Sequence, residues 1–139
     1  MKTQNVGSPH VDCEVVNVRR PAKSVRAPKL LVDTGSEFSW IAESILREAG
    51  ILIAKKDLRF LMANGQTVTR STGYAILRAE GFETIDEVVF GQPGDLSLLG
   101  SRTLEGFGAS VDARKRRLVA GGHHPAAGGL RVIAPRSCR

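Results

Sequence analysis

The chain has 139 residues, of which 42% are hydrophobic, so it is long enough for one globular domain with a modest core. Its 20 Lys and Arg residues against 14 Asp and Glu residues give a net charge of +6, a balance compatible with a nucleic-acid partner. The basic excess lies mainly in residues 19–26 and 114–117, and only 5% of the residues are aromatic. Single-strand binders interleave basic residues with stacking rings, so we interpret these stretches as solvated surface and expect no nucleic-acid partner.

The N-terminal ten residues contain no apolar stretch of signal-peptide length, and no run of the chain approaches the length of a membrane span. The sequence therefore predicts a cytoplasmic protein without membrane association. Cys13 and Cys138 lie near opposite ends without a Cys-x-x-Cys pattern, which favours reduced thiols. The only histidine pair, His123-His124, has no cysteine or acidic residue near it, so we expect no metal site.

The first third of the chain predicts two strands joined by a loop. Residues 11–18 alternate between apolar and polar side chains and then shift phase at Val15-Val16, which indicates a strand with a bulge. Residues 19–28 are basic and contain two prolines, as in an exposed loop. Residues 29–32 are apolar after Lys29, which predicts a short strand buried on both faces.

This strand leads directly into the sequence Asp-Thr-Gly-Ser at positions 33–36. Gly35 permits a tight turn that a Cβ would obstruct, so Asp33 is expected at the end of a buried strand, with its carboxylate at the floor of a cleft. Thr34 and Ser36 add hydroxyls that can hold the carboxylate or brace the loop. Because Asp-Thr-Gly occurs by chance in about one chain in forty of this length, the surrounding segments decide its meaning.

The middle of the chain predicts one short helix and a hairpin. Residues 37–41 form a second strand that packs its aromatic side chains under the turn, with Trp40 in the core rather than in contact with a ligand. Residues 42–49 predict a helix that Gly50 ends in the left-handed conformation. A hairpin follows, with strands at 58–62 and 66–70; its return strand is rich in threonine and is expected to project into solvent.

The remaining segments continue as β-structure with a second short helix. Gly73 predicts a kink before a strand at 74–79, and Gly81 predicts a turn before a strand at 84–90. A loop at 91–95 and the leucines that follow lead to a brief helix at 101–107, with Ser101 as its N-cap. Gly106 weakens this helix by about 1 kcal/mol relative to Ala, and Gly108 ends it.

A last hairpin, at 109–112 and 117–120, encloses a basic turn. We assign residues 1–120 to one domain and residues 121–139 to a Gly/Pro-rich tail with a possible strand at 130–134.

Three linked features now stand out: an apolar strand ending in Asp-Thr-Gly-Ser, a polar hairpin, and an apolar Leu-Leu-Gly sequence before a short helix. Over roughly residues 11–120 they resemble the single-domain, retropepsin-like aspartic proteases, the group of the retroviral proteases and their bacterial and archaeal relatives. The first feature, with Trp40 just after it, is also similar to the active-site strand of pepsin. The resemblance implies an all-β fold, mainly β with two short helices, closed into a barrel-like acid-protease lobe, one lobe per chain.

The resemblance assigns a role to each of the three features. It implies Asp33 as the catalytic residue, a flap that closes over substrate, and a hydrophobic-hydrophobic-Gly motif that packs against the Asp-Thr-Gly loop. The implied active-site loop residues are Thr34, Gly35 and Ser36; the flap residues are Met62, Ala63, Asn64 and Gly65; and the loop-supporting residues are Leu98, Leu99 and Gly100. No cofactor and no metal is implied.

Peptide hydrolysis by carboxylates requires one group to take a proton from water while a second, protonated group polarises the carbonyl. Two adjacent carboxylates cannot both ionise, so the pair holds a single proton. The chain contains one Asp-Thr-Gly and no Asp-Ser-Gly, and its other aspartates lack that context: Asp12, Asp57, Asp86, Asp95 and Asp112. We therefore expect a homodimer in which Asp33 of two copies face each other across a two-fold axis.

The resemblance further implies that Thr34 hydrogen-bonds across this axis and that Ser36 bonds the outer carboxylate oxygen. The substrate is expected to be an extended peptide, bound by strand addition. Glu37 is either a specificity residue at the edge of the cleft or, as we favour, an exposed charge. Family members often carry an arginine near the third motif that braces the dimer; here Arg102 is shifted from that position, and we interpret it as a surface residue.

Two other functions compete with an aspartic endopeptidase. One is a catalytically silent module of the same fold that binds peptide or only dimerises, against which the intact Asp33-Thr34-Gly35 argues. The other is a basic β-domain that binds nucleic acid. Affinity for single-stranded DNA that falls steeply with salt and survives Asp33→Asn would favour it.

Overall fold

A computed structural model of the chain describes residues 9–121. The fold is all-β with two short helices, as the sequence predicts. The helices are α1 (Glu43–Glu48) and α2 (Ser101–Phe107). The strands are β1 (His10–Val16), β2 (Ser24–Val32), β3 (Ser39–Ala42), β4 (Lys55–Leu61), β5 (Thr67–Ala79), β6 (Phe82–Gly91), β7 (Leu98–Leu99), β8 (Ala109–Asp112) and β9 (Arg117–Ala120).

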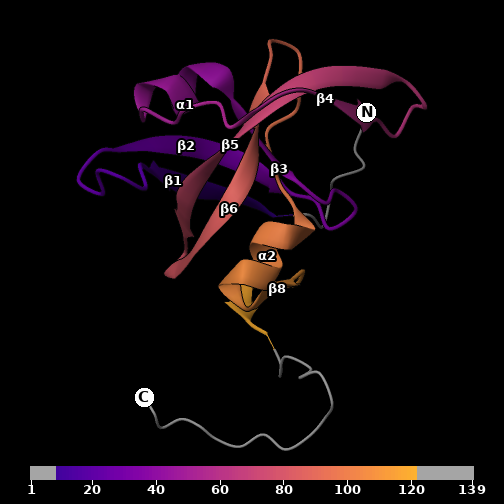
Figure 1. Ribbon diagram of the computed structural model, residues 1–139. Helices are drawn as coiled ribbons and strands as arrows, with labels where there is room; N and C mark the ends of the chain where they lie inside the picture. Colours follow the sequence, from indigo (N-terminus) through magenta and orange to yellow (C-terminus); the bar gives the residue numbers. More distant parts are fainter. Residues whose placement is uncertain (1–8, 122–139) are drawn as a thin grey trace, which may run out of the picture.

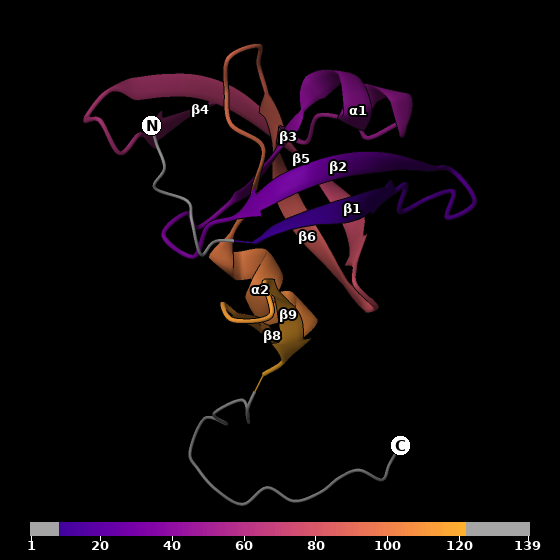
Figure 2. The ribbon, with the colours of Figure 1, turned by 180° about the vertical axis from the view of Figure 1, so that it is seen from behind.

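Seven strands form one sheet that closes on itself. Their order is β1-β2-β7-β3-β6-β5-β4, and β1 pairs additionally with β5, so that six strands make a ring and β4 extends from it as the outer arm of a hairpin. The pairs β2–β7 and β3–β6 are parallel. In Figures 1 and 2, α1 and α2 lie at opposite ends of this ring, with the two-stranded sheet β8–β9 beside α2.

Two apolar clusters hold the fold together. The larger one fills the ring and includes the fully buried Leu30, Ile41, Leu77 and Phe90. The second cluster centres on Trp40, Val89 and Leu98, and the partly buried Leu31, Phe38, Phe60, Met62 and Val68 pack against it. The strand before the Asp-Thr-Gly turn therefore has apolar contacts on both faces, because Leu30 and Val32 contribute to the first cluster and Leu31 to the second.

Residues 19–23 form the expected loop, but residues 24–28 belong to a strand, and the bulge expected at Val15-Val16 is wrong. Strand β2 begins at Ser24, and the register irregularity places Pro28 and Lys29 opposite the single residue Asp12. A proline has no N–H to donate, so a bulge is a position in which a strand tolerates it. Lys29 takes a positive φ there, and its N–H donates to the Asp12 carboxylate at 3.0 Å. The bulge therefore accommodates Pro28 within strand β2, and no loop is needed there.

Two further local predictions are corrected. Gly73 does not kink the chain, because β5 runs unbroken from Thr67 to Ala79; a Cβ at Gly73 would collide with the Leu52 carbonyl, so the glycine permits a close approach of two backbones. The N-cap of α2 is Gly100 rather than Ser101, and no side chain caps the helix. Gly108 ends the helix as predicted, in the left-handed conformation with φ 68°.

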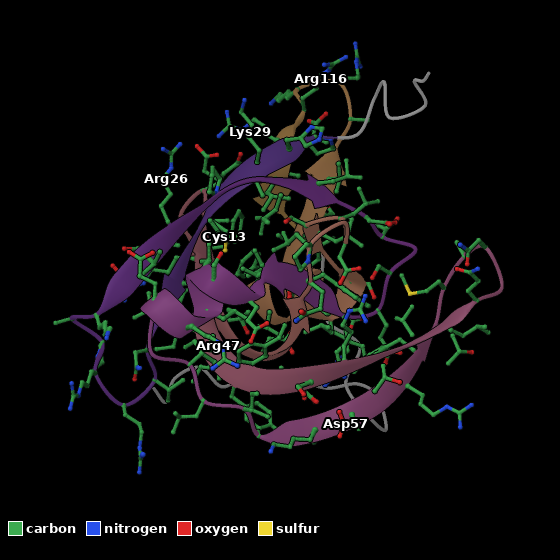
Figure 3. The ribbon with its side chains drawn as sticks, turned by 90° about the horizontal axis from the view of Figure 1, so that it is seen from above. Cys13, Arg26, Lys29, Arg47, Asp57 and Arg116 are labelled. Atoms are coloured by element: carbon green, nitrogen blue, oxygen red, sulfur yellow. The ribbon has the colours of Figure 1, made fainter. Side chains whose placement is uncertain are left out.

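The predicted tail from residue 122 onwards, the strand at 130–134, the His123-His124 pair and Cys138 lie outside the described residues. Cys13 is a free cysteine buried within the ring, and Figure 3 shows it among the strands while Arg26 and Arg116 point outwards. In residues 9–121, neither helix is long and apolar enough to cross a membrane.

Candidate active site

The loop between β2 and β3 holds Asp33 by hydrogen bonds within the loop. The Gly35 N–H donates to Asp33 Oδ1 at 2.9 Å, and the Ser36 N–H donates to the Asp33 carbonyl at 3.1 Å. Asp33 is partly exposed, and Thr34 is exposed. The loop therefore fixes one carboxylate oxygen in the fold and leaves the neighbouring hydroxyl of Thr34 accessible from outside the chain.

Strand β7 supports this loop from behind. Leu98 and Leu99 pair in parallel with Leu31 and Val32. The ladder continues past the end of β2, because the Asp33 N–H donates to the Leu99 carbonyl at 2.9 Å. The Leu-Leu-Gly motif thus lies directly against the Asp-Thr-Gly loop, in the arrangement that the sequence resemblance implies.

The loop also caps helix α2. The first N–H groups of a helix have no partner inside it. Here the Ser101 N–H donates to the Ser36 carbonyl at 2.7 Å, and the Arg102 N–H donates to the Glu37 carbonyl at 3.1 Å. A Cβ at Gly100 would lie 2.8 Å from the Ser36 carbonyl oxygen and would collide with the Phe38 carbonyl. A larger residue at position 100 would therefore clash with the loop backbone. The carbonyls of that loop take the place of a capping side chain.

A chain of buried hydroxyls connects the same region to the core. The Gly100 N–H donates to Ser39 Oγ at 2.9 Å, Ser39 Oγ lies 2.6 Å from Thr103 Oγ1, and Thr103 Oγ1 donates to Asp86 Oδ2 at 2.8 Å. Because Thr103 gives its proton to the carboxylate, Ser39 must donate to Thr103. Ser39 and Thr103 are fully buried, and satisfied buried hydrogen bonds of this kind fix a single arrangement of the elements that carry them.

The hairpin β4–β5 packs over the loop through aromatic side chains. The Phe60 ring on β4 makes edge contacts with Phe38 and Trp40, with centroid distances of 5.4 Å and 5.3 Å. In Figures 1 and 2, the tip of this hairpin and the loop at 33–37 project from the same side of the molecule. Trp40 is 5% exposed and belongs to the second apolar cluster, so it is a core residue as predicted, but it also lines the cavity between the loop and the hairpin.

A cavity of about 400 Å³ lies between the loop and the hairpin. The loop side contributes Asp33, Gly35, Ser36, Glu37, Phe38 and Trp40; the hairpin contributes Phe60, Leu61, Met62 and Ala63; the segment around β7 contributes Leu96 and Leu98. Asp33 is thus a carboxylate in the wall of a largely apolar cavity. Of the predicted flap residues, Met62 and Ala63 line this cavity, whereas Asn64 and Gly65 are exposed at the tip of the turn.

The base of the hairpin is tied to the loop before β7 by an ion pair. The Arg70 guanidinium donates to both oxygens of Asp95, from Nε at 2.7 Å and from Nη2 at 2.8 Å, and the Gln92 N–H donates to the same carboxylate at 2.7 Å. The side chains of Arg70 and Asp95 are 18% and 14% exposed. The hydrogen bond from Arg70 lowers the pKa of Asp95, against the opposing effect of burial. This pair sets the position of β5 relative to the segment that carries the Leu-Leu-Gly motif.

Two sequence-based interpretations of the site change, those of Ser36 and Arg102, and the favoured one for Glu37 holds. The Ser36 hydroxyl donates to the Phe38 carbonyl at 2.8 Å instead of to the Asp33 carboxylate, so within one chain it braces the loop. Arg102 is not a plain surface residue, because its guanidinium carbon lies 4.8 Å from the centroid of the Phe38 ring. Glu37 is exposed, as we favoured, and it also lines the cavity.

Sequence reasoning missed Phe60, Leu61 and Leu96 as cavity residues. Leu61 and Leu96 are 77% and 69% exposed, unusually high values for leucine. The sequence did contain two signals: Leu61 stands shortly before the Asn-Gly turn, and Leu96 directly follows a Gly-Asp turn. Their meaning depends on the hairpin folding back over the loop, which local pattern does not specify.

A scan against models of protein families gave no match, and a search of curated proteins gave none either. In residues 9–121, no group of three or more His, Cys, Asp or Glu side chains is arranged to hold a metal ion. The interpretation of the site therefore rests on its own geometry.

Proposed function

We propose that the chain is one half of an aspartic endopeptidase of the retropepsin-like kind, completed when a second copy brings its own Asp33 to the first. The observation that carries the proposal is the position of Asp33, held by the Gly35 N–H in the wall of an apolar cavity beneath a hairpin. A single carboxylate cannot be base and acid at once, whereas a pair that shares one proton can be both. The exposed Thr34 next to Asp33 is available for contact with the partner loop.

In the proposed reaction, the ionised carboxylate of the pair takes a proton from a water molecule as that water attacks the peptide carbonyl. The protonated carboxylate donates a hydrogen bond to the carbonyl oxygen and stabilises the negative charge that develops there. Proton transfer to the amide nitrogen then releases the amine and the acid, and the pair again holds one proton. Apolar side chains around the cavity exclude water and accept apolar side chains of the substrate.

The test replaces Asp33 with Asn, which removes the charge and preserves the shape. We expect cleavage of denatured casein to fall by at least about a hundredfold, the lower range of acid–base catalysis, at every pH between about 3 and 8, the range in which carboxyl pairs titrate. Light scattering should report the same dimer for the variant and the wild type. Asp57→Asn, at an exposed aspartate on β4, is the matched control and should cleave as the wild type does.

Two results would count against the proposal. One is unchanged cleavage by Asp33→Asn, and the other is a wild-type chain that digests casein as a strict monomer. A wild-type dimer that binds unfolded peptide without hydrolysing it would instead support the silent module of the same fold.

A further inference from the structure

A second depression lies away from the Asp33 cavity. It has a volume of about 250 Å³ and is lined by the segment after α1, the start of the loop that follows β1, and residues of β5 and β6. Four of its lining side chains are large, apolar and exposed: Val18 at 41%, Leu52 at 69%, Tyr74 at 48% and Ile85 at 60%. Only two other large apolar side chains in residues 9–121 are comparably exposed, and both line the Asp33 cavity.

A basic depression adjoins this apolar groove. The two share Asn17, Arg19, Gly50 and Leu52 in their linings, and the second adds Arg20 and Lys23. In Figures 1 and 2 the loop between β1 and β2, which carries these cations, lies beside α1. Among the described residues, none of the three cations forms an ion pair, and no Asp or Glu lines either depression.

Asn17 holds the backbone of the loop that carries the cations. Its side-chain amide donates to the carbonyls of Ala49 and Gly50 at 3.0 Å and 3.1 Å, and its oxygen accepts the N–H groups of Arg19 and Arg20, both at 2.9 Å. The backbone of the loop is therefore fixed to the end of α1, and the three exposed cations extend from a fixed loop beside the apolar groove. A fixed arrangement of this kind lowers the entropy lost when a partner binds.

We propose that this surface, defined by Val18, Arg19, Arg20, Lys23, Leu52 and Ile85, docks a protein segment in which an apolar side chain is flanked by Asp or Glu residues. The apolar side chain fills the groove, and the carboxylates pair with the three cations. Charge complementarity selects this occupant. The chain's own segments 1–8 and 122–139 contain no Asp or Glu, and a second copy docking through the same face would bring two basic loops together.

The residues that line the surface favour a protein partner over a nucleic acid or a membrane. Single-stranded nucleic acids need several stacking rings, and Tyr74 is the only aromatic residue that lines either depression. A membrane surface is bound by apolar side chains that protrude from a face, whereas these side chains surround a concave groove. The proposal is independent of peptide hydrolysis at Asp33.

The test selects peptides from a random twelve-residue phage library against the full chain carrying Asp33→Asn, which prevents cleavage from interfering. We expect the enriched peptides to share one Leu, Ile or Phe next to two or more acidic residues. A fluorescent copy of the most enriched peptide should bind at least about tenfold more weakly to Arg19→Ser/Arg20→Ser/Lys23→Ser and to Leu52→Ser/Ile85→Thr, a loss typical of central interface residues. Arg114→Ser/Lys115→Ser/Arg116→Ser removes three cations from the turn between β8 and β9 and should leave the affinity unchanged.

Any of three results would overturn the proposal: enriched peptides without the acidic and apolar pattern, equal loss of affinity in the control triple variant, or tighter binding of single-stranded DNA or of phosphatidylglycerol vesicles that the groove substitutions abolish. If a groove variant fails to fold, amide chemical shifts of the Asp33→Asn chain decide the matter. Added peptide should then shift Val18, Leu52, Tyr74 and Ile85, and shifts confined to other residues would refute the docking site.

Discussion

Replacing Gly100 with Ala tests how tightly the candidate catalytic loop is packed. Gly100 has φ −93° and ψ 179°, an extended conformation that alanine adopts without strain. Any loss of stability must therefore come from steric overlap between the new Cβ and its neighbours. The new Cβ would lie 2.6 Å from the carbonyl carbon of Phe38 and 2.8 Å from the carbonyl oxygen of Ser36, against an ordinary carbon–oxygen contact of about 3.3 Å or more.

The neighbouring backbone cannot withdraw without losing hydrogen bonds. Gly100 follows β7, which is paired with β2 on one side and β3 on the other. Overpacking at such a position costs about 1–3 kcal/mol, and loss of the bond from the Ser101 N–H to the Ser36 carbonyl adds about 1 kcal/mol. A total of about 3 kcal/mol corresponds to a fall in Tm of roughly 10 °C for a domain of this size.

Thermal unfolding at a fixed protein concentration measures this effect, because the proposed dimer would make Tm depend on concentration. Gly65→Ala is the informative comparison: Gly65 has φ +87° with no atom within 4 Å of an added Cβ, so only the left-handed conformation costs energy, about 1–2 kcal/mol. We expect Gly100→Ala to unfold at the lower temperature of the two. A Gly100→Ala chain that unfolds no earlier than Gly65→Ala would show that the loop is not packed as described.

Two further predictions concern titratable groups in the same fold. Because the pKa of Asp95 is lowered in the folded chain, its pair with Arg70 stabilises the fold above the unfolded pKa of about 3.9 and loses this effect as the pH falls through the folded pKa. Asp95→Asn should therefore cost about 2 kcal/mol near pH 7 in urea unfolding, and this cost should fall as the pH drops below about 3.9; a cost that stays constant as the pH drops would contradict this. Burial raises the pKa of the Cys13 thiol to about 12, so in a Cys138→Ser chain iodoacetamide at pH 8 should label Cys13 only after unfolding, and rapid labelling of the native chain would refute its burial.

Much of the fold was predictable because local signals agreed with one another. The Asn-Gly pair predicted a turn at residues 63–65, and β4 and β5 are joined there, with Gly65 at φ +87°. Gly108 ends α2 as expected. The basic loop at 19–28 was predicted too long, because a bulge lets Pro28 remain inside a strand, and bulges depend on the partner strand rather than on local sequence.

The candidate site was predictable only in part. Asp33, Gly35 and the Leu-Leu-Gly sequence at 98–100 could be identified from the sequence, since each belongs to a short local motif. The contact of Arg102 with Phe38 and the pairing of Arg70 with Asp95 join residues far apart in the chain. Such contacts follow from the way the ring closes, which no single segment encodes.

The capping of α2 by the loop backbone has a practical consequence. The amide protons of Ser101 and Arg102 can exchange with solvent only when the carbonyls of Ser36 and Glu37 move away. Hydrogen–deuterium exchange at two sites in a helix therefore reports how often the loop next to Asp33 opens. Any ligand or partner copy that orders this loop slows exchange at those two amides, without a probe attached to the loop itself.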